Sequence, residues 1–299
     1  MKNKASFSVL CGMLVLLLGS CQKSYDRPDI TLGTGTGSGS SQSGSSSGTL
    51  LVKSESKTRG STEASTIIYT YNASSHLLSV TSVDVDSFNN STTTFYHYSR
   101  DASERITKIA TNVLSVQSPN SGLPDSIVIT VHYPTASSVN FDYSTYTINS
   151  GGISFKDSIA YVYSNGILTD EYEYSGSITG TMQLLQRLQY TFTNNNLVTE
   201  YIYDGTVSAT KYLGTYAIEY DTKTAGLYTG NEGFLPGQNA AYACKNNLTK
   251  FTFTDNTTNT VIVNSTYAYQ YNANNQPVSG TIQSTIPVNK TADVKNTYQ

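Results

Sequence analysis

Residues 69–78, YTYNASSHLL, contain the pattern that decides the fold: two tyrosines one residue apart, a polar turn and then an aliphatic residue. The pattern returns at 269–278 (YQYNANNQPV), at 190–197 (YTFTNNNL) and, less closely, at 96–106 (YHYSRDASERI). Side chains one residue apart share a face of a β-strand, and Asn-rich stretches form tight turns. Each copy therefore predicts the end of one strand, a turn and the start of the next.

Alternation of this kind continues through most of the chain, and the composition suits it. Tyrosine is abundant with 24 residues, tryptophan is absent, and charged residues make up 13% of the sequence. We therefore predict one all-β domain over residues 50–299, an antiparallel meander of repeated hairpins that forms a curled sheet or a partly closed barrel. Residues 182–189 (MQLLQRLQ) have helix-like spacing but are too short to stand alone, so we expect them to extend a strand. Residues 222–247 predict a long excursion between strands.

The two faces of the strands differ in chemistry. In residues 171–174 (EYEY) and 200–204 (EYIYD) the acids alternate with aromatic residues, and we expect the acids on a solvated face. Most tyrosine rows are expected to pack across strands, whereas exposed rows stack on sugars or contact protein partners. The candidate binding face consists of Tyr172, Tyr174, Tyr201, Tyr203, Tyr267, Tyr269 and Tyr271.

The N-terminus predicts export. Residues 1–20 have a basic start and an apolar stretch too short to span a bilayer, which is typical of a signal peptide. The signal ends in Leu18, Gly19 and Ser20 before Cys21, which resembles the lipobox of bacterial lipoproteins. That resemblance implies lipidation of Cys21 and an outer-membrane lipoprotein that faces the periplasm or the cell surface. The alternative is an ordinary signal peptide cleaved elsewhere.

Residues 21–49 follow as a tether rich in Gly, Ser and Thr. Such a chain is flexible and has a mean reach of roughly 30 Å. With Cys11 in the signal and Cys21 lipidated, Cys244 is the remaining thiol, so no intramolecular disulfide is expected and Cys244 is predicted to be a buried small hydrophobe. Loss of the signal lysines takes the formal charge from -3 to -5, which argues against nucleic acid as a partner.

The lipobox, the tether and the repeated Tyr-x-Tyr-Asn pattern together resemble a group of Bacteroidota lipoproteins that carry a domain of unknown function described as porin-like. The pattern is also similar to the tyrosine-aspartate (YD) repeats of Rhs-type proteins, in which strands wind into a long curled sheet. The resemblance covers residues 67–283, but Asn or Ser replaces the usual Asp and the turn glycine is often missing. It implies an architecture and a compartment, and no catalytic residue. A membrane pore is not expected, because the faces opposite the tyrosines are polar.

Residue types that could carry chemistry do not converge in the sequence. His76, His97 and His132 are widely spaced, so we predict exposed histidines, no metal site and no cofactor. Glu171 with Glu173, and Asp84 with Asp86, have a spacing compatible with the carboxylate pair of glycoside hydrolases, but such pairs normally come from different strands. Neither a Gly-x-Ser-x-Gly elbow nor a calcium loop is present. Ser126 and Ser158, each in an Asp-Ser-Ile triplet, resemble O-glycosylation acceptors of the same bacterial group; the alternative is a polar strand start.

Three functional hypotheses follow. The first is a non-catalytic envelope module, held at the membrane through Cys21, that binds a glycan, a peptide or an envelope protein. The second is a structural component of an envelope assembly with no ligand of its own. The third, a glycan-active enzyme, has the least support, so the chain is not expected to be an enzyme.

Overall fold

The computed structural model describes residues 50–113, 126–135, 138–143, 146–148, 153–177, 180–205, 212–236, 240–286 and 288–299. Within these ranges the chain forms 17 strands and two short 3-10 helices, η1 (Gly230–Phe234) and η2 (Ala240–Ala243). In this part of the chain no helix has both the length and the apolar character needed to cross a bilayer. The signal, the lipobox with Cys21 and the tether predicted for residues 1–49 lie outside the described residues.

The strands are β1 (Leu51–Thr58), β2 (Ala64–Tyr71), β3 (Leu77–Val85), β4 (Ser91–Arg100), β5 (Ile106–Thr111), β6 (Ile127–Thr135), β7 (Ser138–Tyr143), β8 (Tyr146–Ile148), β9 (Ile153–Ser164), β10 (Ile167–Ser177), β11 (Gln183–Thr193), β12 (Asn196–Asp204), β13 (Tyr212–Thr224), β14 (Asn246–Asp255), β15 (Thr260–Tyr271), β16 (Pro277–Ile286) and β17 (Lys290–Tyr298).

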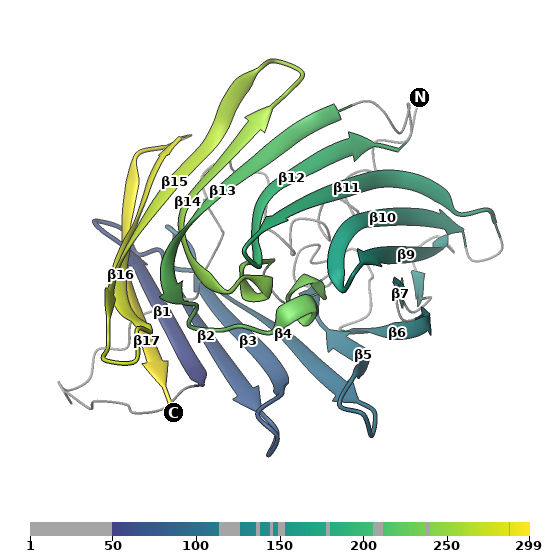
Figure 1. Ribbon diagram of the computed structural model, residues 1–299, viewed down its shortest axis with the longest axis horizontal. Coiled ribbons are helices and arrows are strands. Elements are labelled where there is room, and N and C mark those ends of the chain that lie inside the picture. Colours follow the sequence, from purple (N-terminus) through teal and green to yellow (C-terminus); the bar gives the residue numbers. More distant parts are fainter. Residues whose placement is uncertain are drawn as a thin grey trace.

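Every described strand pair is antiparallel, and consecutive strands pair almost throughout. The exception is β8, which shares β9 as a partner with β7. β1 pairs with β2 on one side and with β17 on the other, so the sheet curls until its first and last strands meet (Figure 1). The predicted all-β antiparallel meander is confirmed, and residues 183–189 belong to β11, as expected.

Three of the four copies of the repeated pattern share one turn geometry, which the β3–β4 turn at Asp86 also has; in the copy at 190–197 the turn consists of Asn194 and Asn195, both with positive φ. Asn72, Asp86, Asp101 and Asn272 each begin a turn, and the side-chain Oδ1 of each accepts the N–H groups two and four residues later at 2.8–3.0 Å. The residue three positions after each has a positive φ of 61–66°. An Asx side chain that replaces backbone partners in this way stabilises the reversal and fixes the register of the hairpin. The sequence pattern therefore corresponds to a real structural unit.

Most tyrosines on the side of the sheet that faces the enclosed space, here called the inner face, hold neighbouring strands together. Tyr69, Tyr98 and Tyr161 are buried there. The ring of Tyr216 on β13 stacks on Phe253 of β14 with centroids 4.4 Å apart. Such contacts across strands are the expected source of stability in a sheet, and the outer face is left to polar and scattered apolar side chains.

The Asx turns give a test of the repeat. Asn272→Ala removes the acceptor for two N–H groups and should lower the free energy of unfolding by about 1 kcal/mol. Asn272→Asp keeps an acceptor oxygen in the position that Asp86 and Asp101 already occupy in their turns, and should lose less. Urea unfolding of the two variants measures the difference, and equal losses would show that the Oδ1 contacts do not matter.

Candidate functional site

The excursion between β13 and β14 enters the space enclosed by the sheet. Its described residues, 225–236 and 240–245, include η1 and η2 and are called the inner segment below. Its apolar residues Phe234, Leu235 and Cys244 are buried, and they belong to the same core as the inner face of the strands. Figure 1 shows both helices inside the ring of strands. The predicted excursion is therefore confirmed, and it forms part of the core.

Tyrosine hydroxyls bind the backbone of the inner segment. Tyr161 on β9 donates to the carbonyl of Phe234 at 2.7 Å, and Tyr98 on β4 donates to the carbonyl of Pro236 at 3.3 Å. The Phe234 ring lies 5.3 Å from the ring of Tyr190 on β11. The inner segment has little regular structure, so its buried carbonyls need partners from elsewhere, and these strands supply two of them.

A partly buried ion pair adds a charged contact between the strands and η1. Arg100 at the end of β4 donates to both carboxylate oxygens of Glu232, at 2.7 and 2.8 Å. The Arg100 side chain is 5% exposed, and it also donates to the carbonyls of Leu77 and Glu104. Bidentate geometry with every donor direction used is the arrangement in which a buried arginine stabilises most.

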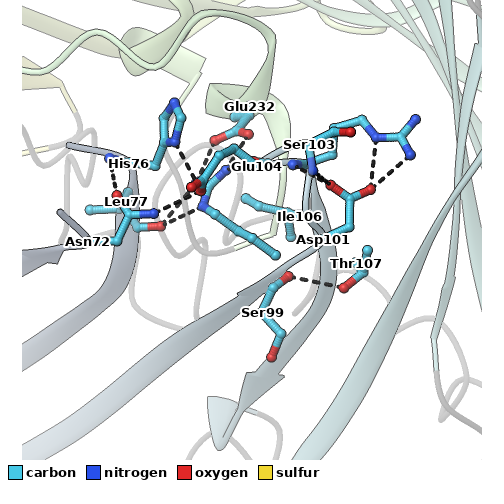
Figure 2. Close-up of polar contacts among 12 residues, drawn as sticks. Asn72, His76, Leu77, Ser99, Asp101, Ser103, Glu104, Ile106, Thr107 and Glu232 are labelled. Carbon is cyan, nitrogen blue, oxygen red and sulfur yellow. Dashed lines mark hydrogen bonds and ion pairs between the residues drawn. The ribbon is translucent and has the colours of Figure 1, made fainter. Parts of the chain in front are cut away.

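The turns around this pair are tied to each other. Glu104 in the β4–β5 turn accepts from Asn72 at 2.8 Å and lies 3.1 Å from Nδ1 of His76, both in the β2–β3 turn (Figure 2). The hydrogen bond from His76 is the main cause that lowers the pKa of Glu104. Two copies of the repeated turn thus form one rim beside η1.

A cavity of about 670 Å³ opens between this rim and the inner segment. It is lined by Leu50 and Leu51, by Tyr71, by Ser75–Leu77, by Thr224–Glu232, and by Asn274 and Gln276 of the β15–β16 turn. Two copies of the Tyr-x-Tyr-Asn pattern, far apart in sequence, therefore face the same space. The volume lies within the range of sites for small molecules.

The cavity combines apolar walls with neutral polar groups. Leu51, Leu77 and Leu227 are buried, whereas the Tyr228 ring is 53% exposed at the cavity. Asn231 donates to the carbonyl of Gly166, which leaves its side-chain oxygen as an acceptor. Glu232 pairs with Arg100, and Nδ1 of His76 lies 3.1 Å from the carboxylate of Glu104. The arrangement suits a neutral ligand with one apolar face and several hydroxyl or amide groups.

The acidic residues of β10 and β12 lie opposite to expectation. Glu171, Glu173 and Glu200 are buried on the inner face, not solvated, and Asp157 of β9 is buried with them. We call these four residues the inner acidic cluster. Tyr190 donates to Glu171 at 2.7 Å, yet burial raises the pKa of Glu171 to about 7 and that of Asp157 to about 6. None of the four lines the cavity.

The outer face of the same strands explains the reversal. Arg187 lies between the rings of Tyr172 and Tyr203, 5.7 and 5.3 Å from their centroids, and pairs with Asp170 at 2.6 Å. These four side chains make a half-exposed amphipathic surface whose polar ends reach water. Because successive residues of a strand point to opposite faces, Glu171 and Glu173 then lie on the inner face.

The candidate binding tyrosines do not share one face. Strand register places Tyr172, Tyr174, Tyr201 and Tyr203 on the outer face of β10 and β12. Tyr267, Tyr269 and Tyr271 of β15 lie on the inner face, where Tyr267 and Tyr269 stack with centroids 6.4 Å apart. A binding face composed of all seven is therefore excluded by the register of the sheet.

The remaining candidates lie in separate places. Ser126 is exposed just before β6, and Ser158 is a half-buried residue of β9. His97 and His132 are exposed on β4 and β6, and the described residues contain no group of three or more His, Cys, Asp or Glu suited to a metal ion. Cys244 is fully buried, as predicted, and burial raises the pKa of its thiol.

Sequence reasoning missed the cavity and the residues that build it. Arg100, Tyr228 and Glu232 had no motif to mark them, and the pairing of Arg100 with Glu232 spans 132 residues. The one available signal was the irregular excursion itself, since loops carry function more often than strands do.

Comparisons with known proteins add a likeness of shape. No family model matches the chain, and no curated protein sequence does. Among solved structures, a porin-like protein from Bacteroides uniformis is similar with a TM-score of 0.45 and 12% identity, over 84% of this chain and 98% of that one. A porin-like protein from Bacteroides vulgatus is similar with a TM-score of 0.46 and 11% identity, over 84% and 99%. The function is therefore argued from the side chains.

Removal of the Arg100 side chain should free the inner segment. Arg100→Ala leaves Glu232 and two backbone carbonyls without their donor, so we expect the free energy of unfolding to fall by about 3 kcal/mol. Arg100→Lys keeps the positive charge but not the bidentate guanidinium, so the free energy of unfolding should fall by less than in Arg100→Ala. Denaturant unfolding measures both. The matched control is Arg59→Ala, which breaks an exposed pair with Asp293 and should leave the midpoint nearly unchanged.

Proposed function

We propose that this chain is a lipid-anchored cell-envelope protein whose folded domain is a non-catalytic binding module for a neutral glycan. The observation that carries the proposal is the cavity beside Tyr228, where an exposed aromatic ring lies among amide side chains and above buried leucines. Sugars offer an apolar face to aromatic rings and hydroxyl groups to amides, so this combination fits them. Among the described residues that line the cavity, Glu232 is the one carboxylate and is paired with Arg100, which favours an uncharged sugar over an acidic one.

The outer face supports a domain held in water by its tether. Lys250 of β14 pairs with Glu219 of β13, and both side chains are substantially exposed on the outer face. Arg59 pairs with Asp293 of β17 in an equally exposed position. Hydrocarbon would reject such groups, whereas water and a surface glycan accept them. The expected anchor at Cys21 would then keep the domain near the membrane without insertion of its strands.

A structural role without a ligand is the second candidate. It is favoured by the tyrosines buried in the core and by the stacking of Tyr267 on Tyr269, because these rings act as internal packing and not as a contact surface. An enzymatic role has less support, because Glu171 and Glu173 lie in the core and do not line the cavity.

A binding test separates the first two candidates. The mature full-length chain is screened on an array of neutral oligosaccharides, and hits are measured by calorimetry. Tyr228→Ala should weaken binding about tenfold, because the variant removes the exposed ring of the cavity. The matched control, Phe88→Ala, removes a ring that is 84% exposed in the β3–β4 turn and should have no effect. No hit on the array, or equal effects of the two variants, would favour the structural role.

The anchor is tested independently. Cys21→Ser should release the protein from the membrane fraction of expressing cells, and intact mass should lack the increment of a diacylglyceryl group. Wild-type protein should carry that increment at Cys21 and partition with the membranes. A wild-type chain with an unmodified Cys21 would contradict the lipoprotein assignment and leave the glycan site unaffected.

A further inference from the structure

The inner acidic cluster is connected directly to the inner segment. Glu171 accepts from Tyr190, whose ring packs on Phe234 of η1. Tyr161 is the register partner of Glu171, and its hydroxyl donates to the Phe234 carbonyl. The two tyrosines that hold η1 in place thus also face the cluster, and η1 forms one wall of the cavity.

The cluster lacks the partners that ionised carboxylates need. Neither side-chain oxygen of Glu200 has a hydrogen-bond partner, and one oxygen each of Glu171, Glu173 and Asp157 also has none among the described residues. In the same part of the chain no ion pair joins any of the four to a lysine or arginine. A buried charge without a partner costs more than a folded domain tolerates, so the groups must bind protons.

Among the described residues, the titratable groups that face the cluster from neighbouring elements are tyrosines. They are Tyr161 and Tyr163 of β9, Tyr190 of β11 and Tyr216 of β13, while η1 contributes the uncharged Phe234. None of them supplies a positive charge. Ionisation of one carboxyl group therefore repels the others, and burial followed by the charges of Glu171, Asp157 and Glu200 raises the pKa of Glu173 well above its usual value.

We propose that the inner acidic cluster is a proton-operated latch: while its carboxyl groups are protonated, β9–β12 hold the inner segment in place, and their ionisation releases η1, which forms one wall of the cavity. The step is a simple loss of protons to water, so no bond other than O–H is broken. The consequence for a ligand rests on the proposed function, but movement of the inner segment does not.

The direction of the pH effect follows from proton binding. The folded state keeps these protons at a pH where the unfolded chain has lost them, because the folded pKa values are raised, to about 6 for Asp157 and about 7 for Glu171. The closed state is therefore favoured at low pH, and its advantage declines as pH rises from the unfolded value near 4.5 through about 7 and beyond. Each unit of raised pKa corresponds to about a tenfold change in the opening equilibrium.

Hydrogen exchange of the full-length chain tests the latch without any ligand. Amides of residues 224–236 are followed from about pH 5.5 to about pH 8.5, with rates corrected for intrinsic exchange. In the wild type we expect the opening equilibrium of this segment to rise at least about tenfold across the range. Glu200→Gln should reduce that rise, and a Glu171→Gln, Glu173→Gln, Glu200→Gln triple variant should abolish it, since an amide cannot ionise.

A surface variant and a cation control complete the test. Glu219→Gln makes the same chemical change at an exposed position of β13 and should behave as the wild type does. Opening that is independent of pH in the wild type, or dependent on pH to the same extent in the triple variant, would overturn the latch. So would opening that responds to a divalent cation or to EDTA in place of pH. If the triple variant does not fold, Glu200→Gln decides. Failure to bind any glycan would refute the proposed function and leave this result intact.

Discussion

The structure depends on how the space inside the curled sheet is filled. The interior of a barrel of about eight strands is filled by the side chains of its own strands, whereas a barrel with about twice as many strands has a central space that they do not fill. Here the described part of the chain forms a sheet of 17 strands that curls until β1 meets β17, so its inner face encloses more space than that of a small barrel. The inner segment between β13 and β14 supplies part of the missing volume, with Phe234, Leu235 and Cys244 as its buried residues. Removal of that filling would expose the aromatic inner face to water.

Such a filling explains why the strands use tyrosine where phenylalanine would bury more easily. The inner segment has little regular structure, so its carbonyls need donors from elsewhere. The hydroxyl group at the far end of a tyrosine ring can donate a hydrogen bond to the inner segment, as Tyr161 does to the carbonyl of Phe234 and Tyr98 to that of Pro236. The same residue thus packs its ring against the sheet and pairs the backbone that it covers. The tyrosine-rich composition follows from an interior that must be both apolar and rich in donors.

Local rules predicted the scaffold well because they act over a few residues. Asn72 and Asn272 begin turns of one geometry, and each needs nothing beyond its own side chain and the next four residues. Alternation predicted the strands for the same reason. The cavity could not be predicted in this way, because Arg100 meets Glu232 from 132 positions away, and no local pattern encodes that contact.

The faces of the strands show where alternation stops being informative. A period of two residues says that Glu171 and Glu173 share a side and that Tyr172 takes the other, but it does not say which side is the interior. The expectation that acids face water fails here: Tyr172 lies on the outer face beside Arg187 of the next strand, and the glutamates are buried. Once that outer contact forms, the register forces both glutamates inward, where protons must neutralise them. A favourable surface contact on one face thus creates an ionisable core on the other, and the closure of the interior becomes dependent on pH.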